Sequence, residues 1–389
     1  MRTQVAIIGG GPAGLLLSHL LHQRGVESVV VERQTREYVR SRIRAGVLEW
    51  GSAGILREAG LGERMDREGR IHAGSMVAWK GERTFFIDIE KHCSRPFTAY
   101  GQTQLQEDLD EASDARGGVV IDAAENAFPH DVLTDKPWLA YEKDGVEHRI
   151  DCDFIAGCDG GHGVSREAIS GEVLLEYERV YPFGWLGILS ETPPIEHITY
   201  CNSSRGFALA SQRNPMLSRY YLQVPETDSI EEWPDHRFWD ELQKRFPPEI
   251  SDVIVTGPSI EKSIAPLRSF VAEPMRYGNL FLAGDAAHIM PPTGAKGLNL
   301  AISDAWYLSN ALADYYTTGS TARLDEYSEI ALRRAWSAAR FSWWLTSLLH
   351  RFPEEGEFGQ RIQESELDYL ASSPAYQQSI AQQYAGLPL

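Results

Sequence analysis

The apolar positions near the start of the chain follow an order that predicts a strand, a helix and a second strand. Residues 5–8 (VAII) form a short apolar run typical of a buried strand, and the leucines between residues 15 and 21 recur at helical spacing. Gly25 ends the predicted helix, and residues 26–31 form a second apolar run that ends at Glu32. We therefore expect a βαβ unit on a parallel sheet.

A glycine-rich turn, GGGPAG at residues 9–14, joins the first strand to the helix. Gly9, Gly11 and Gly14 match the GxGxxG spacing, which allows a tight turn, a close approach of phosphate and close packing of the helix. The helix N-terminus favours a pyrophosphate, and Glu32 stands where ribose hydroxyls need an acceptor. The turn predicts a dinucleotide without distinguishing FAD from NAD, and alone it also fits an ordinary glycine-rich turn.

Two later segments favour FAD. Residues 153–160 (DFIAGCDG) predict a strand that runs into a turn with Asp159, and residues 280–288 (LFLAGDAAH) predict a strand that ends at Gly284 and Asp285. Asp285 would accept a hydrogen bond from a ribityl hydroxyl, although an acid that caps a helix leaves the same pattern. The helix expected after residues 291–294 would direct its N-terminus at the flavin ring. The sequence has no second GxGxxG unit, so we expect no separate Rossmann domain for a nicotinamide cofactor.

The rest of the pattern predicts an α/β (α+β) fold. Strands and helices alternate to about residue 72, residues 74–100 and 175–267 are richer in strand signals, and residues 299–352 have helical periodicity. We expect a Rossmann-like FAD-binding domain from residues 1–73, 101–174 and 268–298. Residues 74–100 and 175–267 would form a substrate-binding domain with an antiparallel sheet, and residues 299–389 a helical C-terminal region.

Composition narrows the choice of partners. The 389 residues carry a net charge of −18, which disfavours nucleic acid and anionic membrane surfaces. The four cysteines form no CxxC pair, so we expect no metal site and no redox dithiol, and a cytoplasmic location fits best. No apolar run reaches the roughly 18 residues that suggest a membrane-spanning helix.

Together, the GxGxxG turn, the DG pair at 159–160 and the GD pair at 284–285 resemble the group A flavoprotein aromatic hydroxylases. Segments at residues 42–49, 181–187, 263–270, 291–300 and 384–388 are similar to the 4-hydroxybenzoate 3-monooxygenase branch of that family. This resemblance implies tightly but non-covalently bound FAD. It also implies conversion of 4-hydroxybenzoate to 3,4-dihydroxybenzoate by NADPH and O2 through a flavin C4a-hydroperoxide, in a homodimer.

The same resemblance assigns the two ends of the substrate. Ser211, Arg213 and Tyr221 would hold the carboxylate, and the planar guanidinium of Arg213 suits a bidentate contact. Tyr200 would contact the phenol, with Tyr384 as its hydrogen-bond partner, His72 at the solvent end of a proton relay, and the Pro292 carbonyl near the ring. Such a relay is needed because a free phenol has a pKa of about 10. Without the resemblance, the same residues would be interpreted as ordinary structural ones: arginines exposed on a polar sheet face, aromatics of the core and a surface histidine.

The cofactor contacts are also implied by resemblance. For FAD, besides the residues already named, they are Arg42, Arg44, Gln102, Arg219, Lys296, Leu298 and Asn299. For NADPH they are Arg33, Gln34, Tyr38, Arg42, Arg44, His162 and Arg268. Residues 33–44 hold five arginines and one acid, which favours the 2′-phosphate of NADPH, although a solvated basic loop has the same composition.

Four residues depart from the family pattern: Gly161, Arg36, Arg40 and Thr199. The first three bear on cofactor affinity, and Thr199 bears on tolerance for ring substituents. Three other functions stay open on sequence. They are the same chemistry on another para-substituted benzoate such as 4-aminobenzoate or 3,4-dihydroxybenzoate, an FAD/NADPH reductase that does not activate oxygen, and a non-catalytic flavin sensor.

Overall fold

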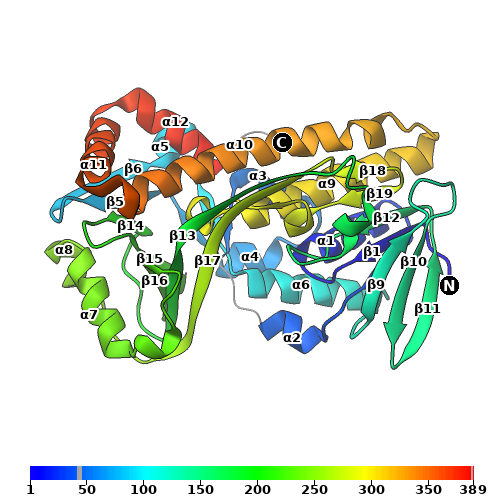
Figure 1. Cartoon of the computed structure of the whole chain (residues 1–389), viewed down its shortest axis with the longest axis horizontal. Helices are drawn as coiled ribbons and strands as arrows, with labels where there is room; N and C mark the ends of the chain where they lie inside the picture. The colour runs from blue at the N-terminus through cyan, green and yellow to red at the C-terminus, as the bar shows by residue number, and fades with distance from the viewer. Residues whose placement is uncertain (42–45, 387–388) are drawn as a thin grey trace.

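The computed structural model describes residues 1–41, 46–386 and 389. One end of the molecule carries the N-terminus and the parallel strands, and the other carries most of the long antiparallel strands (Figure 1). Helix α10 (Ala322–Leu349) runs along most of the length and joins the two ends. The predicted mixed α/β fold with a helical C-terminal region is confirmed.

A six-stranded sheet forms the N-terminal end, and it confirms the predicted βαβ unit. β1 and β2 are parallel, and α1 (Pro12–Gln23) connects them. The second strand begins at Ser28, two residues later than expected. Only β18 runs antiparallel to its neighbour. In order across the sheet the strands are β18 (Arg276–Tyr277), β19 (Leu280–Leu282), β12 (Phe154–Gly157), β1 (Val5–Ile8), β2 (Ser28–Val31) and β8 (Val119–Ile121).

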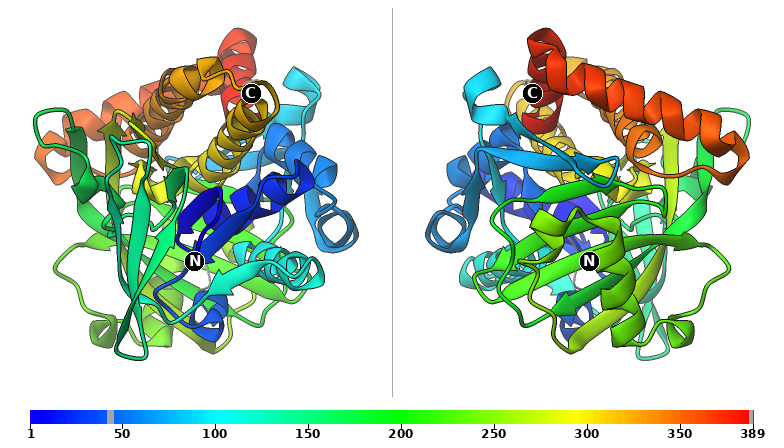
Figure 2. Two further views of the ribbon diagram at one scale, coloured as in Figure 1. Left: turned by 90° about the vertical axis from the view of Figure 1, so that its right-hand side faces the viewer. Right: turned by 90° about the vertical axis from the view of Figure 1, so that its left-hand side faces the viewer.

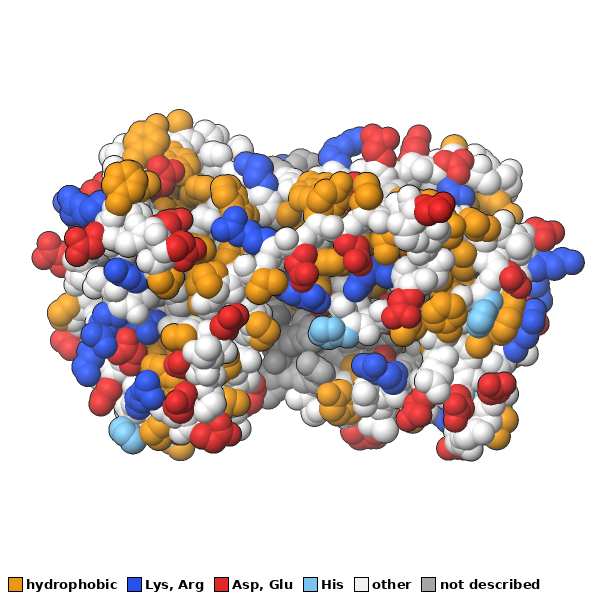
Figure 3. Space-filling view, in the orientation of Figure 1, with side chains coloured by type: hydrophobic (Ala, Val, Ile, Leu, Met, Phe, Trp, Pro, Cys, Tyr) orange, Lys and Arg blue, Asp and Glu red, His pale blue; other side chains and the backbone are white. Residues whose placement is uncertain are grey.

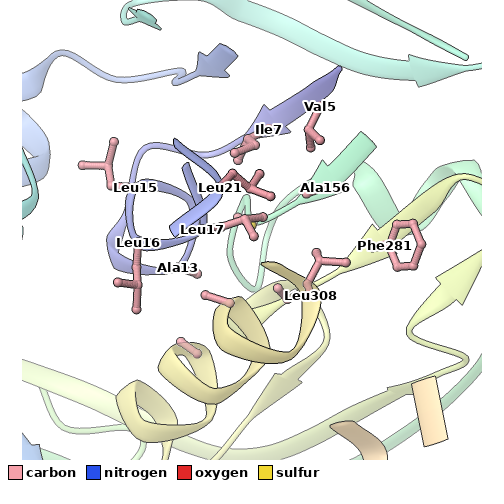
Figure 4. Packing of buried hydrophobic residues seen from close by; sticks show 14 of the residues in the cluster. Val5, Ile7, Ala13, Leu15, Leu16, Leu17, Leu21, Ala156, Phe281 and Leu308 are labelled. Carbon is pink, nitrogen blue, oxygen red and sulfur yellow. The ribbon is translucent and has the colours of Figure 1, made fainter. Parts of the chain in front are cut away.

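Apolar side chains pack this sheet against helices α1 and α9 (Gly297–Thr318). Leu16 and Leu17 of α1, Leu308 of α9 and Ile7 of β1 are fully buried in one cluster (Figure 4). Burying each such side chain stabilises the fold by about 1.5–3 kcal/mol. The core therefore fixes the position of α1 and α9, whose N-termini both adjoin the cavity described below.

An eight-stranded sheet forms the other end of the molecule. Its neighbours are antiparallel, except that β14 and β5 run parallel. β20 joins this sheet from the segment that follows the GD pair, so the sheet reaches back toward the N-terminal end. In order the strands are β20 (His288–Ile289), β17 (Ser259–Glu273), β13 (Leu175–Ser190), β16 (Leu217–Pro225), β15 (Ala208–Asn214), β14 (Thr199–Asn202), β5 (Gly74–Trp79) and β6 (Arg83–Asp88).

The two faces of this sheet pack against different helices. Tyr220 and Leu222 belong to a buried cluster with Trp239 of α7 (Asp235–Arg245). Tyr200 and Leu209 belong to a second cluster with residues of α10 and of α12 (Pro374–Ala385). Because side chains alternate along a strand, this second face carries every other residue of β14, β15 and β16. Figure 2 shows α10, α11 (Gly356–Ser372) and α12 gathered along one side of the molecule.

Short elements connect these layers. Two three-stranded sheets are β11 (Val146–Asp151), β10 (Trp138–Lys143) and β9 (Glu125–His130), and β3 (Val47–Leu48), β7 (Phe97–Ala99) and β4 (Arg70–His72). The remaining α-helices are α2 (Arg36–Ser41), α3 (Trp50–Glu58), α4 (Glu63–Glu68), α5 (Ile89–Cys93), α6 (Gln102–Ala115) and α8 (Pro248–Ser251). The 3-10 turns are η1 (Ser165–Ala168), η2 (Ile230–Glu232), η3 (Gly284–Ala286), η4 (Pro292–Gly294) and η5 (Pro353–Glu355).

The surface mixes charges of both signs over the face shown in Figure 3. No helix in the described part of the chain is both long enough and apolar enough to cross a membrane. Within residues 1–41, 46–386 and 389, no group of three or more His, Cys, Asp or Glu side chains is arranged to hold a metal ion.

Candidate active site

A cavity of about 620 Å³ lies where the glycine turn, the DG pair, the GD pair and the start of α9 converge. These segments are far apart in sequence, and the parallel sheet brings their turns to one edge. Of the residues predicted to bind FAD, the cavity wall includes Gly9, Gly11, Glu32, Gln102, Asp159, Asp285, Lys296 and Leu298.

The glycine turn leaves room for a phosphate. Gly9 has a φ of +110°, and a Cβ there would lie 2.3 Å from the Cys158 carbonyl oxygen. A Cβ on Gly14 would lie 2.0 Å from the Gly9 carbonyl oxygen, whereas one on Gly11 would meet no atom within 4 Å. Gly11 therefore opens onto the cavity beside the N-terminus of α1, which is the arrangement that a pyrophosphate requires.

Two acids at the cavity hold its turns in place. The Glu32 carboxylate accepts the N–H groups of Gly10 at 2.6 Å and Gln34 at 2.7 Å. Asp159 Oδ2 accepts both the N–H and the Oγ–H of Ser165 at 2.9 Å, and burial raises the Asp159 pKa. Its buried Oδ1 has no hydrogen-bond partner among the described residues. A buried oxygen without a donor is costly, so this side of the cavity fits a ligand that donates hydrogen bonds.

Lys296 lines the cavity, but its amine bonds to the protein. Nζ lies 2.6 Å from Glu49 Oε1 and donates to the carbonyl oxygens of Gln383 and Tyr384 at 2.6 and 3.1 Å. Burial lowers the Lys296 pKa. Lys296 thus ties the cavity wall to the end of α12, which carries Tyr384.

Three predicted FAD residues are not on the cavity wall. Gly14 lies behind the turn, and Arg219 lies in β16. The Asn299 amide accepts the Glu49 N–H at 2.8 Å and donates to the carbonyls of Val47 and Ala295 at 2.8 and 2.7 Å. Asn299 therefore fastens β3 and the loop after η4. Arg42 and Arg44 lie outside the described residues.

Two buried tyrosines meet at the predicted phenol end. The Tyr200 hydroxyl of β14 and the Tyr384 hydroxyl of α12 are 2.6 Å apart, and each residue is 5% exposed. Burial raises the Tyr200 pKa well above 10 and the Tyr384 pKa to about 12. Both phenols are therefore neutral at pH 7, and a hydroxyl pair at this distance passes a proton without holding a charge.

His72 lies one aromatic ring away from this pair. Its imidazole stacks on Phe97 with centroids 5.2 Å apart, and Phe97 contacts Tyr384 at 5.1 Å. The prediction put His72 at the solvent end of the relay, but the residue is only 4% exposed. Burial, with help from Arg70 and His197, lowers its pKa to about 4, so it is neutral at pH 7. Its buried Nε2 has no partner among the described side chains and backbone.

Strand register puts Ser211 and Tyr221, two of the predicted carboxylate residues, on the same face as Tyr200. Tyr200 pairs with Leu209, and Leu209 pairs with Tyr221. Ser211 follows Leu209 by two residues and pairs with Arg219, which precedes Tyr221 by two. Paired residues share a face and the side-chain period is two, so these groups all point to the side that packs against α10 and α12.

Arginines and a tyrosine crowd this part of the sheet. Arg219 Nη1 lies 2.7 Å from Glu261 Oε2, and its guanidinium is 5.2 Å from the Tyr221 ring centre. Burial lowers the Arg213 pKa, and its buried Nε has no described partner. Ser211 Oγ donates to the Arg219 carbonyl oxygen at 3.0 Å. Arg213 is half-buried, and its Nη1 donates to the Gln212 carbonyl oxygen at 3.3 Å. The Nε donor that has no described partner suits an anion.

Gly187 of β13 makes space for this cluster. A Cβ at Gly187 would lie 2.8 Å from Tyr221 Cε1 and 3.1 Å from Arg219 Nη2. The sequence drew attention to residues 181–187 only as a matching segment and gave Gly187 no role. Glu261, which pairs with Arg219, was also missed, because its partner lies 42 residues away.

Pro292 belongs to a turn that links the cavity to helix α10. It lines the cavity as part of η4, and its carbonyl oxygen accepts the Ala295 N–H at 3.0 Å. The adjacent Thr293 accepts a hydrogen bond from Thr346 of α10 at 3.0 Å. The turn is thereby fixed against α10, the helix that covers the Tyr200 face of the sheet.

The predicted NADPH residues lie partly at the cavity. Arg33, Gln34, Tyr38 and His162 line it. Arg268 does not, but its Nη2 is 3.5 Å from the Gly161 carbonyl oxygen and its Nη1 is 3.0 Å from Glu178. A Cβ on Gly161 would lie 2.5 Å from Ile289 Cδ1, so the packing here suits the glycine that departs from the family.

Gln106 and Glu49 were not predicted. Gln106 lines the cavity and donates to the Gly10 carbonyl oxygen at 3.0 Å, and Glu49 holds both Lys296 and Arg334. Neither has a sequence signal of its own, because each acts through partners that only the fold brings near. The three turns around one cavity define the class of protein: a flavoprotein that holds FAD.

Comparisons with known proteins give the family. Residues 2–342 match the FAD binding domain family model. The chain is 50% identical to p-hydroxybenzoate hydroxylase of Acinetobacter baylyi, over 100% of this chain and 96% of that one. It is 27% identical to a probable NADH-specific resorcinol 4-hydroxylase of Rhodococcus jostii, over 80% of this chain and 59% of that one. The crystal structure of p-nitrophenol 4-monooxygenase from Pseudomonas putida has the same fold, with a TM-score of 0.83 at 18% identity over 100% of both chains.

The chain therefore belongs to the FAD-dependent aromatic hydroxylases of group A. The resemblance seen in the sequence is confirmed, and so is FAD as the cofactor.

Proposed function

We propose that the protein hydroxylates 4-hydroxybenzoate at the 3-position. The reaction is 4-hydroxybenzoate + NADPH + H⁺ + O2 → 3,4-dihydroxybenzoate + NADP⁺ + H2O. The relative in Acinetobacter baylyi is named p-hydroxybenzoate hydroxylase, and the half-identical sequence supports the same substrate here. The observation that carries the proposal is the buried Tyr200–Tyr384 pair on the sheet face that also bears Ser211 and Tyr221.

The carboxylate end of the substrate would bind the cationic cluster. Arg213 offers two parallel N–H donors to a carboxylate, and Ser211 and Tyr221 add hydroxyl donors. Such a buried, charge-assisted contact orients a flat ligand along the sheet. A para-substituent would then lie away from Arg213, toward Tyr200.

The phenol end would use the two tyrosines. Because the Tyr200 pKa is raised well above 10, Tyr200 stays protonated and donates a hydrogen bond to the substrate oxygen. A proton leaving the substrate would pass to Tyr200 as Tyr200 gives its own proton to Tyr384, 2.6 Å away. The Phe97 ring separates Tyr384 from His72, so transfer on to His72 would need a bridging water. Ring oxidation by an electrophilic oxygen is faster on a phenolate than on a phenol, so removing this proton promotes the reaction.

Bound FAD supplies hydride acceptance from NADPH and activation of O2. The protein's contribution is to hold and enclose it. Gly9 and Gly11 would hold the pyrophosphate, Glu32 the ribose, Asp285 the ribityl chain, and Leu298 the flavin edge. Ile289, Met290 and Pro292 give the wall an apolar stretch, which helps to keep water from the reacting atoms.

NADPH is proposed to approach the same cavity. Arg33, Gln34, Tyr38 and His162 line it, and Arg268 lies beside Gly161. Arg33 is exposed and makes no ion pair with any described residue, so it suits the 2′-phosphate that distinguishes NADPH from NADH. Arg42 and Arg44 remain proposed for both cofactors on the sequence alone.

We also propose a cytoplasmic homodimer. On α11, Phe358, Ile362 and Tyr369 are 77%, 55% and 58% exposed. They follow one another by four and seven residues and so share one face of the helix. An exposed apolar helix face of this kind supports a contact between two copies of the chain.

A ligand panel tests the proposed substrate. NADPH oxidation is measured with 4-hydroxybenzoate, 4-aminobenzoate, 3,4-dihydroxybenzoate and no ligand, with products separated and peroxide counted. We expect 4-hydroxybenzoate to give the fastest oxidation and 3,4-dihydroxybenzoate as product. Faster, product-forming oxidation with 4-aminobenzoate would reassign the substrate. Equal oxidation with no ligand, and no hydroxylated product, would favour a reductase that does not activate oxygen.

A further inference from the structure

Helix α2 is attached to the molecule by ion pairs and not by apolar packing. None of its six residues is buried. Arg36 forms a bidentate pair with Asp114 of α6, at 2.8 Å from Nη1 and 2.7 Å from Nη2. Arg36 Nε also lies 3.3 Å from Asp110 Oδ1, and Arg40 Nε lies 2.6 Å from Asp110 Oδ2. These contacts join α2 to α6 through four charged side chains.

Asp110 is the centre of this cluster. Its side chain is 5% exposed and contacts both arginines, whereas the Asp114 side chain is 59% exposed. A desolvated carboxylate between two guanidiniums is screened less by salt than an exposed pair, and its loss leaves two cations without their shared partner. Asp114 contributes less, because solvent competes for an exposed ion pair.

The cluster decides where part of the cavity wall stands. α6 is fixed to the glycine turn, since Gln106 donates to the Gly10 carbonyl oxygen at 3.0 Å. α2 carries Tyr38 and Val39, which line the cavity, and it follows directly after Arg33 and Gln34. The position of the cavity wall formed by α2, relative to the glycine turn, therefore depends on the ion pairs between α2 and α6.

The same contacts change the interpretation of the basic segment. Arg36 and Arg40 depart from the family pattern, and the arginine-rich composition of residues 33–44 suggested phosphate binding. The structure gives both arginines acidic partners within the protein. They are neutralised locally and hold the helix, while the exposed Arg33 remains available to a phosphate.

We infer that Asp110 is a positioning residue for the nicotinamide dinucleotide. By docking α2 on α6 it sets the place of Tyr38 and Val39 at the cavity, and so the affinity for NADPH. This inference rests on the proposed use of NADPH as reductant. It concerns the binding of the dinucleotide and leaves the site of the aromatic substrate unaffected.

The test compares Asp110→Asn with two matched variants in the FAD-loaded protein. Asp110→Glu keeps the charge, and Glu111→Gln removes one negative charge from an exposed neighbour on α6. We expect Asp110→Asn to raise the KM for NADPH about tenfold, which corresponds to about 1.4 kcal/mol, with kcat at saturating NADPH within about twofold. Asp110→Glu should restore most of the affinity, and Glu111→Gln should match the unaltered protein.

Hydrogen exchange of residues 36–41 provides a readout that does not depend on turnover. In Asp110→Asn these amides should exchange faster, while those of α6 and β1 keep their rates. In the unaltered protein, added salt should speed exchange in α2. An unchanged exchange rate in α2 would overturn the inference.

A lower KM for NADPH in Asp110→Asn would also overturn it, since that result would mean that the freed arginines bind the phosphate themselves. A failure of the proposed function can be told apart from a failure of this inference. If the unaltered protein did not oxidise NADPH in response to 4-hydroxybenzoate, the exchange measurement would still report whether Asp110 docks the helix.

Discussion

At the scale of single residues, the site depends on groups whose protonation is fixed by burial. Tyr200 and Tyr384 are neutral because burial raises the pKa of each phenol. Arg219 has an ion pair with Glu261, and the Nε atoms of both Arg213 and Arg219 have no described partner. These groups are the reason for proposing proton exchange at one end of the face and anion binding at the other.

Replacing Tyr200 with phenylalanine tests the proton path. Tyr200→Phe removes the hydroxyl that lies 2.6 Å from Tyr384, so we expect the hydroxylation rate to fall about 10²- to 10³-fold. The dissociation constant of 4-hydroxybenzoate should change only a few-fold, because Arg213 holds the other end. Single-turnover product formation and ligand titration measure the two effects. Tyr220→Phe is the control, since Tyr220 is equally buried but faces α7; an equal loss in both variants would contradict a specific relay.

A methyl group at Gly187 tests the carboxylate end. The Cβ of Gly187→Ala would lie 2.8 Å from Tyr221, so the ring must shift. Overpacking of this kind costs about 1–3 kcal/mol. We expect the dissociation constant of 4-hydroxybenzoate to rise about tenfold or more, while that of uncharged phenol is little changed. Calorimetric titration with the two ligands measures this difference, and equal weakening of both would argue against a role in carboxylate binding.

The sequence named candidate residues for this site but not the contacts that hold them in place. Tyr200, Tyr384 and Arg213 were named through the resemblance. The register of β14, β15 and β16 then put Tyr200 on the same face as Ser211 and Tyr221. The roles of Gly187 and Glu261 depend on side chains from other strands, so no local pattern reveals them. Asn299 was assigned to the cofactor, yet its amide is used within the fold.

At the scale of elements, local pattern was most informative where the chain is most regular. The periodic leucines and the glycine turn predicted β1 to the residue and α1 and β2 to within two or three residues. Two pairings were not accessible in this way: β14 with β5, which is parallel, and β20 with β17. Each joins segments far apart in sequence, and strand pairing of that kind depends on the whole core.

The glycine turn offers a test at this scale. A Cβ in Gly14→Ala would lie 2.0 Å from the Gly9 carbonyl oxygen, so the turn must move away from its phosphate-binding position. We expect the dissociation constant of FAD to rise about 10- to 100-fold. Gly54→Ala in α3 is the matched control, because a Cβ there meets no atom within 4 Å and alanine favours a helix. Apoprotein titrated with FAD gives the affinities; equal affinity in both variants would contradict the tight-turn argument.

At the scale of the whole molecule, buried neutral histidines link stability to pH. Burial lowers the pKa of His72 to about 4 and that of His350 to about 3. His350 Nε2 accepts the Trp185 indole N–H at 2.7 Å, an interaction that protonation would abolish. An unfolded histidine titrates near pH 6.5, so between that value and the folded pKa the unfolded chain binds more protons.

The stability that these histidines provide is present above about pH 6.5 and is lost as the pH falls through their folded pKa values. We expect each to lower the free energy of unfolding by about 3 kcal/mol on going from pH 7 to pH 4. Urea unfolding across this range measures the slope. His350→Gln, which keeps an acceptor for Trp185, should flatten it, and the exposed His236→Asn should not. An identical slope in His350→Gln would contradict a buried neutral His350.

The central claim is that an FAD-binding cavity and a face with a phenol end and a carboxylate end together insert one oxygen atom into 4-hydroxybenzoate. The most direct test is a reaction under ¹⁸O2 with NADPH, followed by mass spectrometry of the product and measurement of peroxide. We predict 3,4-dihydroxybenzoate that carries one ¹⁸O atom at the 3-hydroxyl, in nearly equal amount to the NADPH consumed. Unlabelled product, or NADPH consumption matched by peroxide with no hydroxylated ring, would contradict the account.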